Sequence, residues 1–278
     1  MCAFFRKDGP HCPFPQMPAS ASRAKFGFGY AFSVTEIFGA GLDLIFPQYC
    51  AGCGAWGAQL CRACLDALRG EWEEVSAGAV YLQVFDPAGE EYMPAFPVFS
   101  LHPHTGTAQK TMAAWKHASL AALDRSLLDL WQMRLVSLRD MPGMETAGAC
   151  VAVNAPSGFR RRHRGQLIAA KLASAAAEVF GCGYCDALRT KFSPGDLRPV
   201  RPHYSVAGKN ERLAKGERIK CVKNLAGREV LLFDDVLTTG ATMLGCARVL
   251  AENGACVRAG ITFSHRGTTG HFGAGGHI

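Results

Sequence analysis

VLLFDDVLTTGAT, residues 230–242, joins an aliphatic run to two carboxylates and a turn of small residues. Val230–Phe233 has the uninterrupted apolar character of a strand that is buried on both faces of a parallel sheet. Asp234 and Asp235 follow where we expect that strand to end, at the edge where open α/β sheets bind their ligands. A solvated loop holds two aspartates at no cost, so their place after a buried strand indicates a binding role.

The turn after the aspartates suits a phosphate group. We expect a helix to begin near residue 241. The free amides and the positive dipole end of a helix N-terminus attract anions, so this turn can bind a phosphate. Small residues let the backbone approach the anion, and threonine hydroxyls donate hydrogen bonds to it. The expected phosphate-binding residues are Thr238, Thr239, Gly240, Ala241 and Thr242. The carboxylates of Asp234 and Asp235 only accept hydrogen bonds, so they suit sugar hydroxyls or a metal-bound water beside that phosphate.

The second half of the chain alternates strands and helices. From Cys150, the strand-like CVAV leads through a loop to a helical run that ends at Gly181, and residues 229–264 repeat strand, helix and strand. This alternation predicts an α/β fold with a mostly parallel sheet that helices flank on both faces. Residues 79–85 and 97–101 also have strand-like patterns, and we expect a helix-rich stretch from there to about residue 141.

The stretch CAGCGAWGAQLCRAC contains two Cys-x-x-Cys pairs with seven residues between them. Each pair offers two thiolates on a tight turn, and two such turns complete the tetrahedral site of a Zn²⁺ ion. Four protein ligands leave no position open for water, so we expect a structural role. A thioredoxin-like redox pair is the alternative. The expected metal ligands are Cys50, Cys53, Cys61 and Cys64.

Composition places these motifs in a globular chain with several parts. The 278 residues are 49% hydrophobic, and no uninterrupted apolar stretch is long enough to span a membrane. The 12 cysteines, without a convincing secretory signal, indicate a reducing, cytoplasmic location. The expected parts are a disordered leader at 1–33, the cysteine module at 34–70, the sheet domain at 71–266 and a flexible tail at 267–278.

A basic stretch lies within the sheet domain. Residues 155–228 contain sixteen Lys or Arg and five Asp or Glu, which points to an anionic partner. Its first loop, NAPSGFRRRHRGQ, follows a predicted strand, so we expect its arginines to face the crevice of Asp234 and to bind pyrophosphate oxygens. These arginines are Arg160, Arg161, Arg162 and Arg164. Residues 198–223 are expected to form a mobile basic loop that closes over the ligand or contacts nucleic acid.

The remaining Cys and His residues carry weaker signals. Cys182 and Cys185 form a Cys-x-x-Cys pair with no second pair nearby. We expect them to pack, with a redox or accessory metal role as the alternative. His102 and His104 are expected to lie in a loop.

Residues 230–242 resemble the phosphoribosyl-pyrophosphate signature of type I phosphoribosyltransferases at all thirteen positions. A phosphorylated ribose also fits both halves of the motif, with its hydroxyls toward the carboxylates and its 5′-phosphate in the turn. The preceding cysteine module extends the likeness. The chain resembles the ComF family over about residues 37–264, through DLIFPQYC, the AAWKH segment, the RRRHRGQ run and the signature itself.

The resemblance implies a type I phosphoribosyltransferase fold with an N-terminal zinc-binding part. It also implies binding of phosphoribosyl pyrophosphate with Mg²⁺ and, if the protein is active, transfer of the phosphoribosyl group to a nitrogen nucleophile. The family also has a role in DNA uptake for some members. The alternative function is therefore a non-catalytic uptake or competence factor that binds single-stranded DNA or a helicase partner. The sequence names neither the acceptor nor the oligomeric state.

Overall fold

The computed structural model describes residues 48–87, 89–117, 120–144, 150–158, 162, 165, 167–191 and 218–267. The chain divides into two units, residues 1–47 and 48–278, and all the described residues belong to the second. The expected leader lies outside the described residues, as does the expected tail apart from Gly267.

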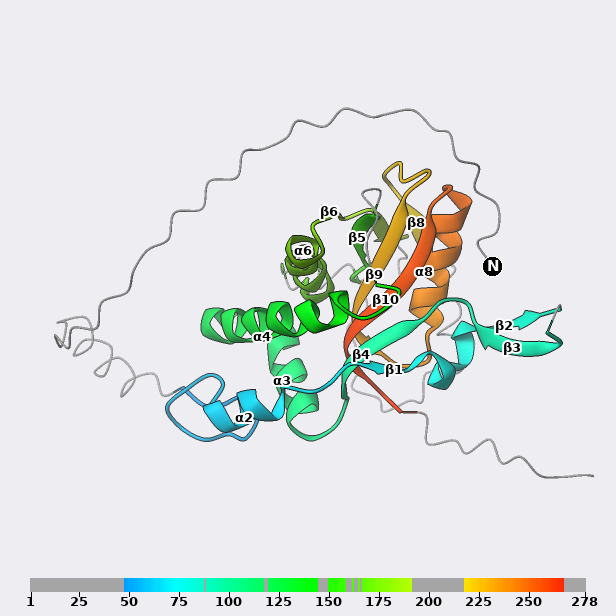
Figure 1. The fold of residues 1–278 in the computed structure, drawn as a ribbon. Coiled ribbons are helices and arrows are strands. Elements are labelled where there is room, and N and C mark those ends of the chain that lie inside the picture. The colour runs from blue at the N-terminus through cyan, green and yellow to red at the C-terminus, as the bar shows by residue number, and fades with distance from the viewer. Residues whose placement is uncertain are drawn as a thin grey trace, which may run out of the picture. The chain divides into compact units, whose positions relative to one another are not determined.

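The central element is a six-stranded sheet in the order β1-β4-β10-β9-β5-β6 (Figure 1). All its neighbouring strands are parallel except β1, which pairs antiparallel with β4. The strands of this sheet are β1 (Glu73–Glu74), β4 (Val98–Pro103), β5 (Cys150–Asn154), β6 (Gly183–Cys185), β9 (Glu229–Leu237) and β10 (Cys256–His265). The α-helices are α2 (Arg62–Ala67), α3 (Gly106–His117), α4 (Ala121–Arg139), α6 (Ile168–Phe180) and α8 (Ala241–Glu252).

Strand β9 shows why this sheet is covered on both faces. Its residues Val230 to Phe233 are fully buried, and they alternate between two hydrophobic clusters. Leu231 and Phe233 join the cluster that includes residues of α3, α4 and α6, whereas Val230 and Leu232 join the cluster that includes α8. The predicted α/β fold, with a mostly parallel sheet flanked by helices, is therefore confirmed.

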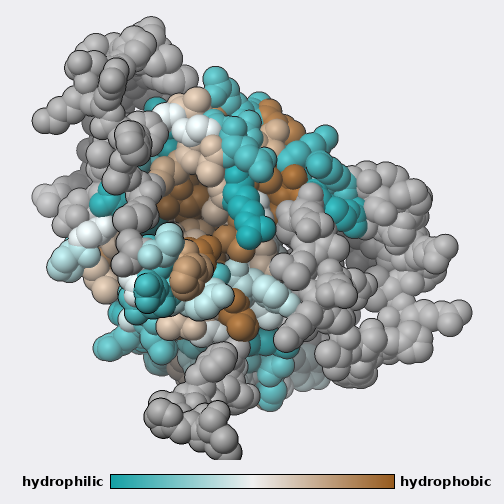
Figure 2. All heavy atoms as spheres, turned by 90° about the vertical axis from the view of Figure 1, so that its right-hand side faces the viewer, coloured by the Kyte–Doolittle hydropathy of each residue, from teal (hydrophilic) through white to brown (hydrophobic). Residues whose placement is uncertain are grey.

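The segment at 79–85 differs from its predicted strand. Two 3₁₀ turns, η1 (Ser76–Gly78) and η2 (Val80–Leu82), lead into strand β2 (Gln83–Asp86), which pairs only with β3 (Glu91–Pro94). This β2–β3 hairpin lies at the right of Figure 1, the side that faces the viewer in Figure 2, where hydrophobic residues are scattered among hydrophilic ones. A second hairpin consists of β7 (Leu188–Thr190) and β8 (Ile219–Cys221).

No helix among the described residues is long and apolar enough to cross a bilayer.

The prediction that His102 lies in a loop is wrong, because it is a buried residue of β4. Burial disfavours the imidazolium and lowers the pKa of His102 to about 4. A hydrogen bond to the Leu68 carbonyl works to raise this pKa, whereas the charges of Arg134 and His265 lower it further. The sequence pattern HPH does not reveal the pairing of β4 with β10, which draws the histidine into the sheet.

Acid should therefore destabilise the protein through His102. The pKa of this histidine is lower in the folded chain than the usual value near 6.5, so the unfolded chain binds the proton more readily. The contribution of His102 to the free energy of unfolding should fall by roughly 3 kcal/mol as the pH drops from about 6.5 to about 4. Denaturant unfolding of the wild type and His102→Gln at several pH values isolates this effect. Equal pH slopes for both proteins would contradict it.

Candidate ligand-binding site and cysteine cluster

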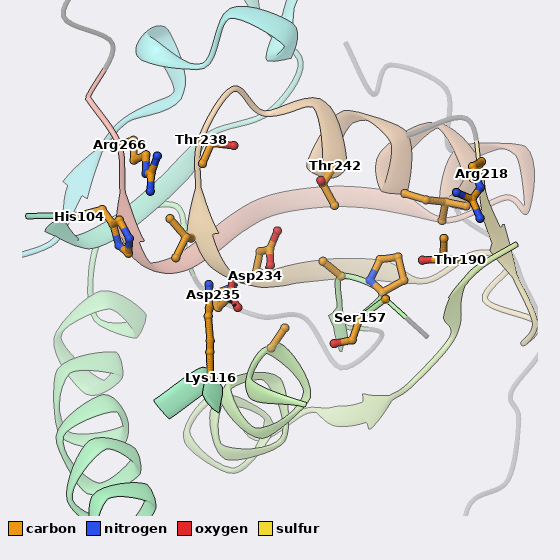
Figure 3. Close-up of a pocket in the computed structure, with 16 residues that line it drawn as sticks. His104, Lys116, Ser157, Thr190, Arg218, Asp234, Asp235, Thr238, Thr242 and Arg266 are labelled. Carbon is orange, nitrogen blue, oxygen red and sulfur yellow. Dashed lines mark hydrogen bonds and ion pairs between the residues drawn. The ribbon is translucent and has the colours of Figure 1, made fainter. Parts of the chain in front are cut away.

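A cavity of about 480 Å³ lies at the carboxyl ends of the central strands (Figure 3). Its walls come from the ends of β4, β5, β9 and β10, from α3, α6 and α8, and from the β7–β8 hairpin. The lining residues with polar side chains are His104, Lys116, Ser157, Thr190, Arg218, Asp234, Asp235, Thr238, Thr242 and Arg266. Four residues that the sequence predicted for one site, Asp234, Asp235, Thr238 and Thr242, thus line one cavity.

The two carboxylates are held by different contacts. The Oδ1 atom of Asp234 accepts a hydrogen bond from the backbone amide of Asp235 at 2.8 Å. The carboxylate of Asp235 forms an ion pair of 2.9 Å with the Nζ atom of Lys116 on α3. Strand β9 does not end at these residues as expected but continues to Leu237, since Val236 and Leu237 pair with β10. The aspartates are therefore fixed by a rigid strand.

The turn from Thr238 to Thr242 connects β9 to the N-terminus of α8. Gly240 is the N-cap and adopts a left-handed conformation with φ of 81°. The carbonyl of Thr239 accepts a hydrogen bond of 2.9 Å from the amide of Tyr81 in η2, so the turn is attached to the segment before the β2–β3 hairpin. Thr239, Gly240 and Ala241 shape this turn, although they are not among the residues that line the cavity.

Replacing Gly240 by alanine should distort this turn. A Cβ atom at Gly240 would lie 3.1 Å from the Cβ of Ala79 and 3.2 Å from that of Leu82, and the left-handed backbone itself costs about 1–2 kcal/mol for a residue with a side chain. If the turn binds phosphate, its displacement should weaken that binding about tenfold or more, equivalent to about 1.4 kcal/mol. Titration calorimetry with ribose 5-phosphate measures this loss.

Gly227→Ala is the matched control, because Gly227 also has a positive φ, 73°, but nothing lies within 4 Å of an added Cβ. It should share the backbone cost and keep the affinity for ribose 5-phosphate. Equal affinity in the two variants would show that the close packing of Gly240 does not matter for the ligand.

The arginine loop is only partly described. Arg160, Arg161 and Arg164 lie outside the described residues. The described member, Arg162, forms a short ion pair with Asp186 and does not line the cavity. Burial raises the pKa of Asp186, but hydrogen bonds from Arg162 and Arg189 outweigh it and hold that pKa below its usual range. A role of these four arginines in pyrophosphate binding stays a prediction.

Several residues of the cavity wall were missed by sequence reasoning. Thr190 belongs to β7, and no motif marks it. Arg218 lies in the basic stretch 198–223 that was expected to close over the ligand, but the residues directly after it form strand β8 and not a loop. His104 and Arg266 each follow the carboxyl end of a strand, β4 and β10, in the way that Asp234 was recognised on β9. The rule that parallel strands bind ligands at their carboxyl ends would have found this second pair.

The cysteine cluster has the geometry of a four-thiolate metal site. The Sγ atoms of Cys50, Cys53, Cys61 and Cys64 all lie within 4.8 Å of one another, and those of Cys53 and Cys61 are 3.7 Å apart. Tetrahedral coordination at about 2.3 Å from each sulfur separates the sulfurs by about 3.8 Å. The residues therefore fit a closed, four-coordinate metal ion.

Backbone amides favour the thiolate of Cys50, whereas burial raises the pKa of Cys64. Cys50 Sγ accepts hydrogen bonds from the amides of Gly52 at 3.4 Å and Cys61 at 3.3 Å. Burial works to raise the pKa of Cys50, but these amide hydrogen bonds prevail and lower it to about 6.

Gly52 lies close to both α2 and α3. A Cβ atom there would lie 2.7 Å from the Sγ of Cys64 in α2 and 2.9 Å from the Cγ2 of Thr107 in α3. The module therefore packs directly against the first turn of α3.

Cys182 and Cys185 lie on opposite faces of the sheet. Cys182 packs against the cluster of α3, α4 and α6. A hydrogen bond between its thiol and the thiol of Cys150 lowers the pKa of Cys182 to about 7. Cys185 packs against the cluster that includes α8, and burial raises its pKa. These surroundings agree with the predicted packing role.

Comparison with known proteins gives one family. Residues 164–271 match the family model of the phosphoribosyl transferase domain. No curated protein matches the chain. Among solved structures, the chain is similar to an adenine phosphoribosyltransferase from Thermoanaerobacter pseudethanolicus, with 15% identity, 58% of this chain and 76% of that chain covered, and a TM-score of 0.32. The matched range contains β9, the signature turn and α8, so this part of the chain is similar to a phosphoribosyl transferase domain.

Proposed function

We propose that the cavity binds phosphoribosyl pyrophosphate with Mg²⁺ and transfers the phosphoribosyl group to a nitrogen nucleophile. One observation carries this proposal: Asp234 and Asp235 line the same cavity as Thr238 and Thr242, at the N-terminus of α8. Carboxylates accept hydrogen bonds from ribose hydroxyls, while the helix N-terminus and threonine hydroxyls favour the 5′-phosphate. The family match to residues 164–271 supports the same substrate class.

In this reaction, a nitrogen lone pair forms a bond to C1 of the ribose as the bond from C1 to the pyrophosphate oxygen breaks. The electron pair leaves with pyrophosphate, and any proton on the attacking nitrogen passes to solvent. Asp234 and Asp235 hold the ribose and face the positive charge that develops on its ring, which is catalysis by positioning and electrostatics. Oxygen ligands of this kind also suit Mg²⁺, which when bound neutralises charge on the leaving pyrophosphate.

The cysteine cluster completes the proposal as a structural Zn²⁺ site in a ComF-like arrangement. Four thiolates with no open position suit zinc and leave no place for catalysis by the metal. A cytoplasmic setting supplies both reduced thiols and the phosphorylated ribose. The alternative partners, single-stranded DNA or a helicase, depend on the basic stretch at 198–223, of which only residues 218–223 are described. No described contact favours that alternative.

Titration calorimetry tests the substrate directly. Phosphoribosyl pyrophosphate with Mg²⁺ should bind the wild type with a dissociation constant of about 1 μM or lower, equivalent to about 8 kcal/mol. Ribose 5-phosphate should compete, because it carries both groups that the motif recognises. Absence of binding by the wild type would refute the proposed function.

A further inference from the structure

One end of the cavity is formed by basic side chains from three different elements. His104 follows β4, Lys116 lies in the last turn of α3, and Arg266 follows β10. In Figure 3, His104 and Arg266 lie together on one side of the two aspartates, opposite Thr190 and Arg218. The cavity therefore has a basic end, defined here as His104, Lys116 and Arg266, beside the predicted ribose site.

The ring of His104 is held in place at this basic end. Its backbone amide donates a hydrogen bond of 2.6 Å to the carbonyl of His265, and its Nδ1 atom lies 2.9 Å from the Oγ of Ser264. The other ring nitrogen, Nε2, has no hydrogen-bond partner among the described residues. A side chain fixed through Nδ1 is suited to contact a ligand through Nε2.

The charges at the basic end do not balance. Lys116 is paired with Asp235, whereas Arg266 forms no ion pair within the described part of the chain. The pKa of His104 is lowered, first by burial and then by the positive charges of Arg266 and Lys116, which outweigh the opposing charge of Asp235. A bound anion would compensate the charge of Arg266.

We propose that the basic end binds a carboxylate of the acceptor, so that the nitrogen nucleophile is an anionic heterocycle or arylamine. This inference rests on the proposed function, because it concerns the second substrate of that reaction. The predicted sites for ribose and 5′-phosphate lie at Asp234, Asp235 and the turn from Thr238 to Thr242. A guanidinium binds a carboxylate in bidentate geometry, and the imidazole of His104 adds a second contact beside it.

Matched ligand pairs test this charge preference. Orotate is compared with uracil, and nicotinate with nicotinamide, because a carboxylate gives each first member a negative charge that its partner lacks. Binding of all four is measured by calorimetry and saturation-transfer NMR, with and without phosphoribosyl pyrophosphate and Mg²⁺. The wild type should bind at least one carboxylate about tenfold more tightly than its neutral partner, as expected for one charge-assisted contact.

Arg266→Gln should remove that preference and leave the affinity for phosphoribosyl pyrophosphate unchanged, while Arg266→Lys should keep part of it. Arg248→Gln removes an equal charge from the exposed surface of α8 and should change neither the carboxylate preference nor the affinity for phosphoribosyl pyrophosphate.

Preferential binding of the neutral partners, or no binding of either carboxylate, overturns the inference. A loss of phosphoribosyl pyrophosphate affinity in Arg266→Gln with the preference intact also overturns it, since Arg266 then contacts a substrate phosphate. If the wild type fails to bind phosphoribosyl pyrophosphate, the proposed function fails and with it the role of the carboxylate as acceptor, whereas the carboxylates measured alone still decide whether the basic end binds a carboxylate.

Discussion

The double variant Asp234→Asn, Asp235→Asn loses nearly all affinity for phosphoribosyl pyrophosphate. Each carboxylate is expected to accept a charge-assisted hydrogen bond from a ribose hydroxyl, and such bonds contribute about 1.5–3 kcal/mol each. Losing both weakens binding roughly a hundredfold to ten-thousandfold. Asparagine keeps the shape of the side chain, so titration calorimetry measures the effect of charge with little change in packing.

Two controls separate this effect from loss of structure. Asp129→Asn removes an exposed carboxylate of α4 outside the cavity, and it should bind like the wild type. The double variant leaves Lys116 without its carboxylate partner, so its thermal unfolding must be recorded beside its affinity. A folded double variant that binds as tightly as the wild type would show that the carboxylates do not hold the ribose.

The second large effect concerns the cysteine cluster. The purified protein should contain about one zinc ion per chain by mass spectrometry, and Cys64→Ser should lose it. Structural zinc contributes about 10–16 kcal/mol of apparent binding free energy in small modules. Cys64 is buried and Leu68 of the same segment is fully buried in the core, so loss of the ion should unfold the module and lower the melting temperature of the protein.

Cys221→Ser is the matched control for that measurement. Its thiol donates to the carbonyl of Lys223 at 3.1 Å, a bond that a serine hydroxyl can also make, and it lies outside the cluster. This variant should retain zinc. Thiol counting on the denatured, unreduced wild type tests the redox alternative, because a disulfide between the paired cysteines would leave fewer reactive thiols and no stoichiometric zinc.

The sequence predicted the second half of the fold because strands buried on both faces have a direct signature. The apolar run of Val230–Phe233 identified β9, and Gly181, with φ of 62°, ends α6 at the predicted place. The end of β9 was placed too early, because its extension depends on pairing with Ser264 and His265 of β10. Pairing across strands leaves no local signal in either segment.

The sequence predicted the part of the candidate site that comes from one continuous motif, and it did not predict the part that comes from other strands and helices. Asp234, Thr238 and Thr242 belong to one continuous motif, so their spacing revealed them together. Lys116 reaches the cavity because α3 follows β4 and β4 lies beside β10 in the sheet, an arrangement between segments far apart in the chain. The sequence placed the loop after β5 in the same crevice, and residues 155–158 of that loop line the cavity, but the described arginine of the loop, Arg162, pairs with Asp186 instead.

Helix α3 joins the two sites of this protein. Its Thr107 lies against Gly52 between the first two cysteines, and its Lys116 pairs with Asp235 in the candidate ligand-binding cavity. A helix of 12 residues spans about 18 Å and resists bending over that length. The cysteine module thus packs against the helix that positions Lys116 in the cavity. Ligand affinity in metal-depleted protein therefore reports on the placement of Lys116 as well as on folding.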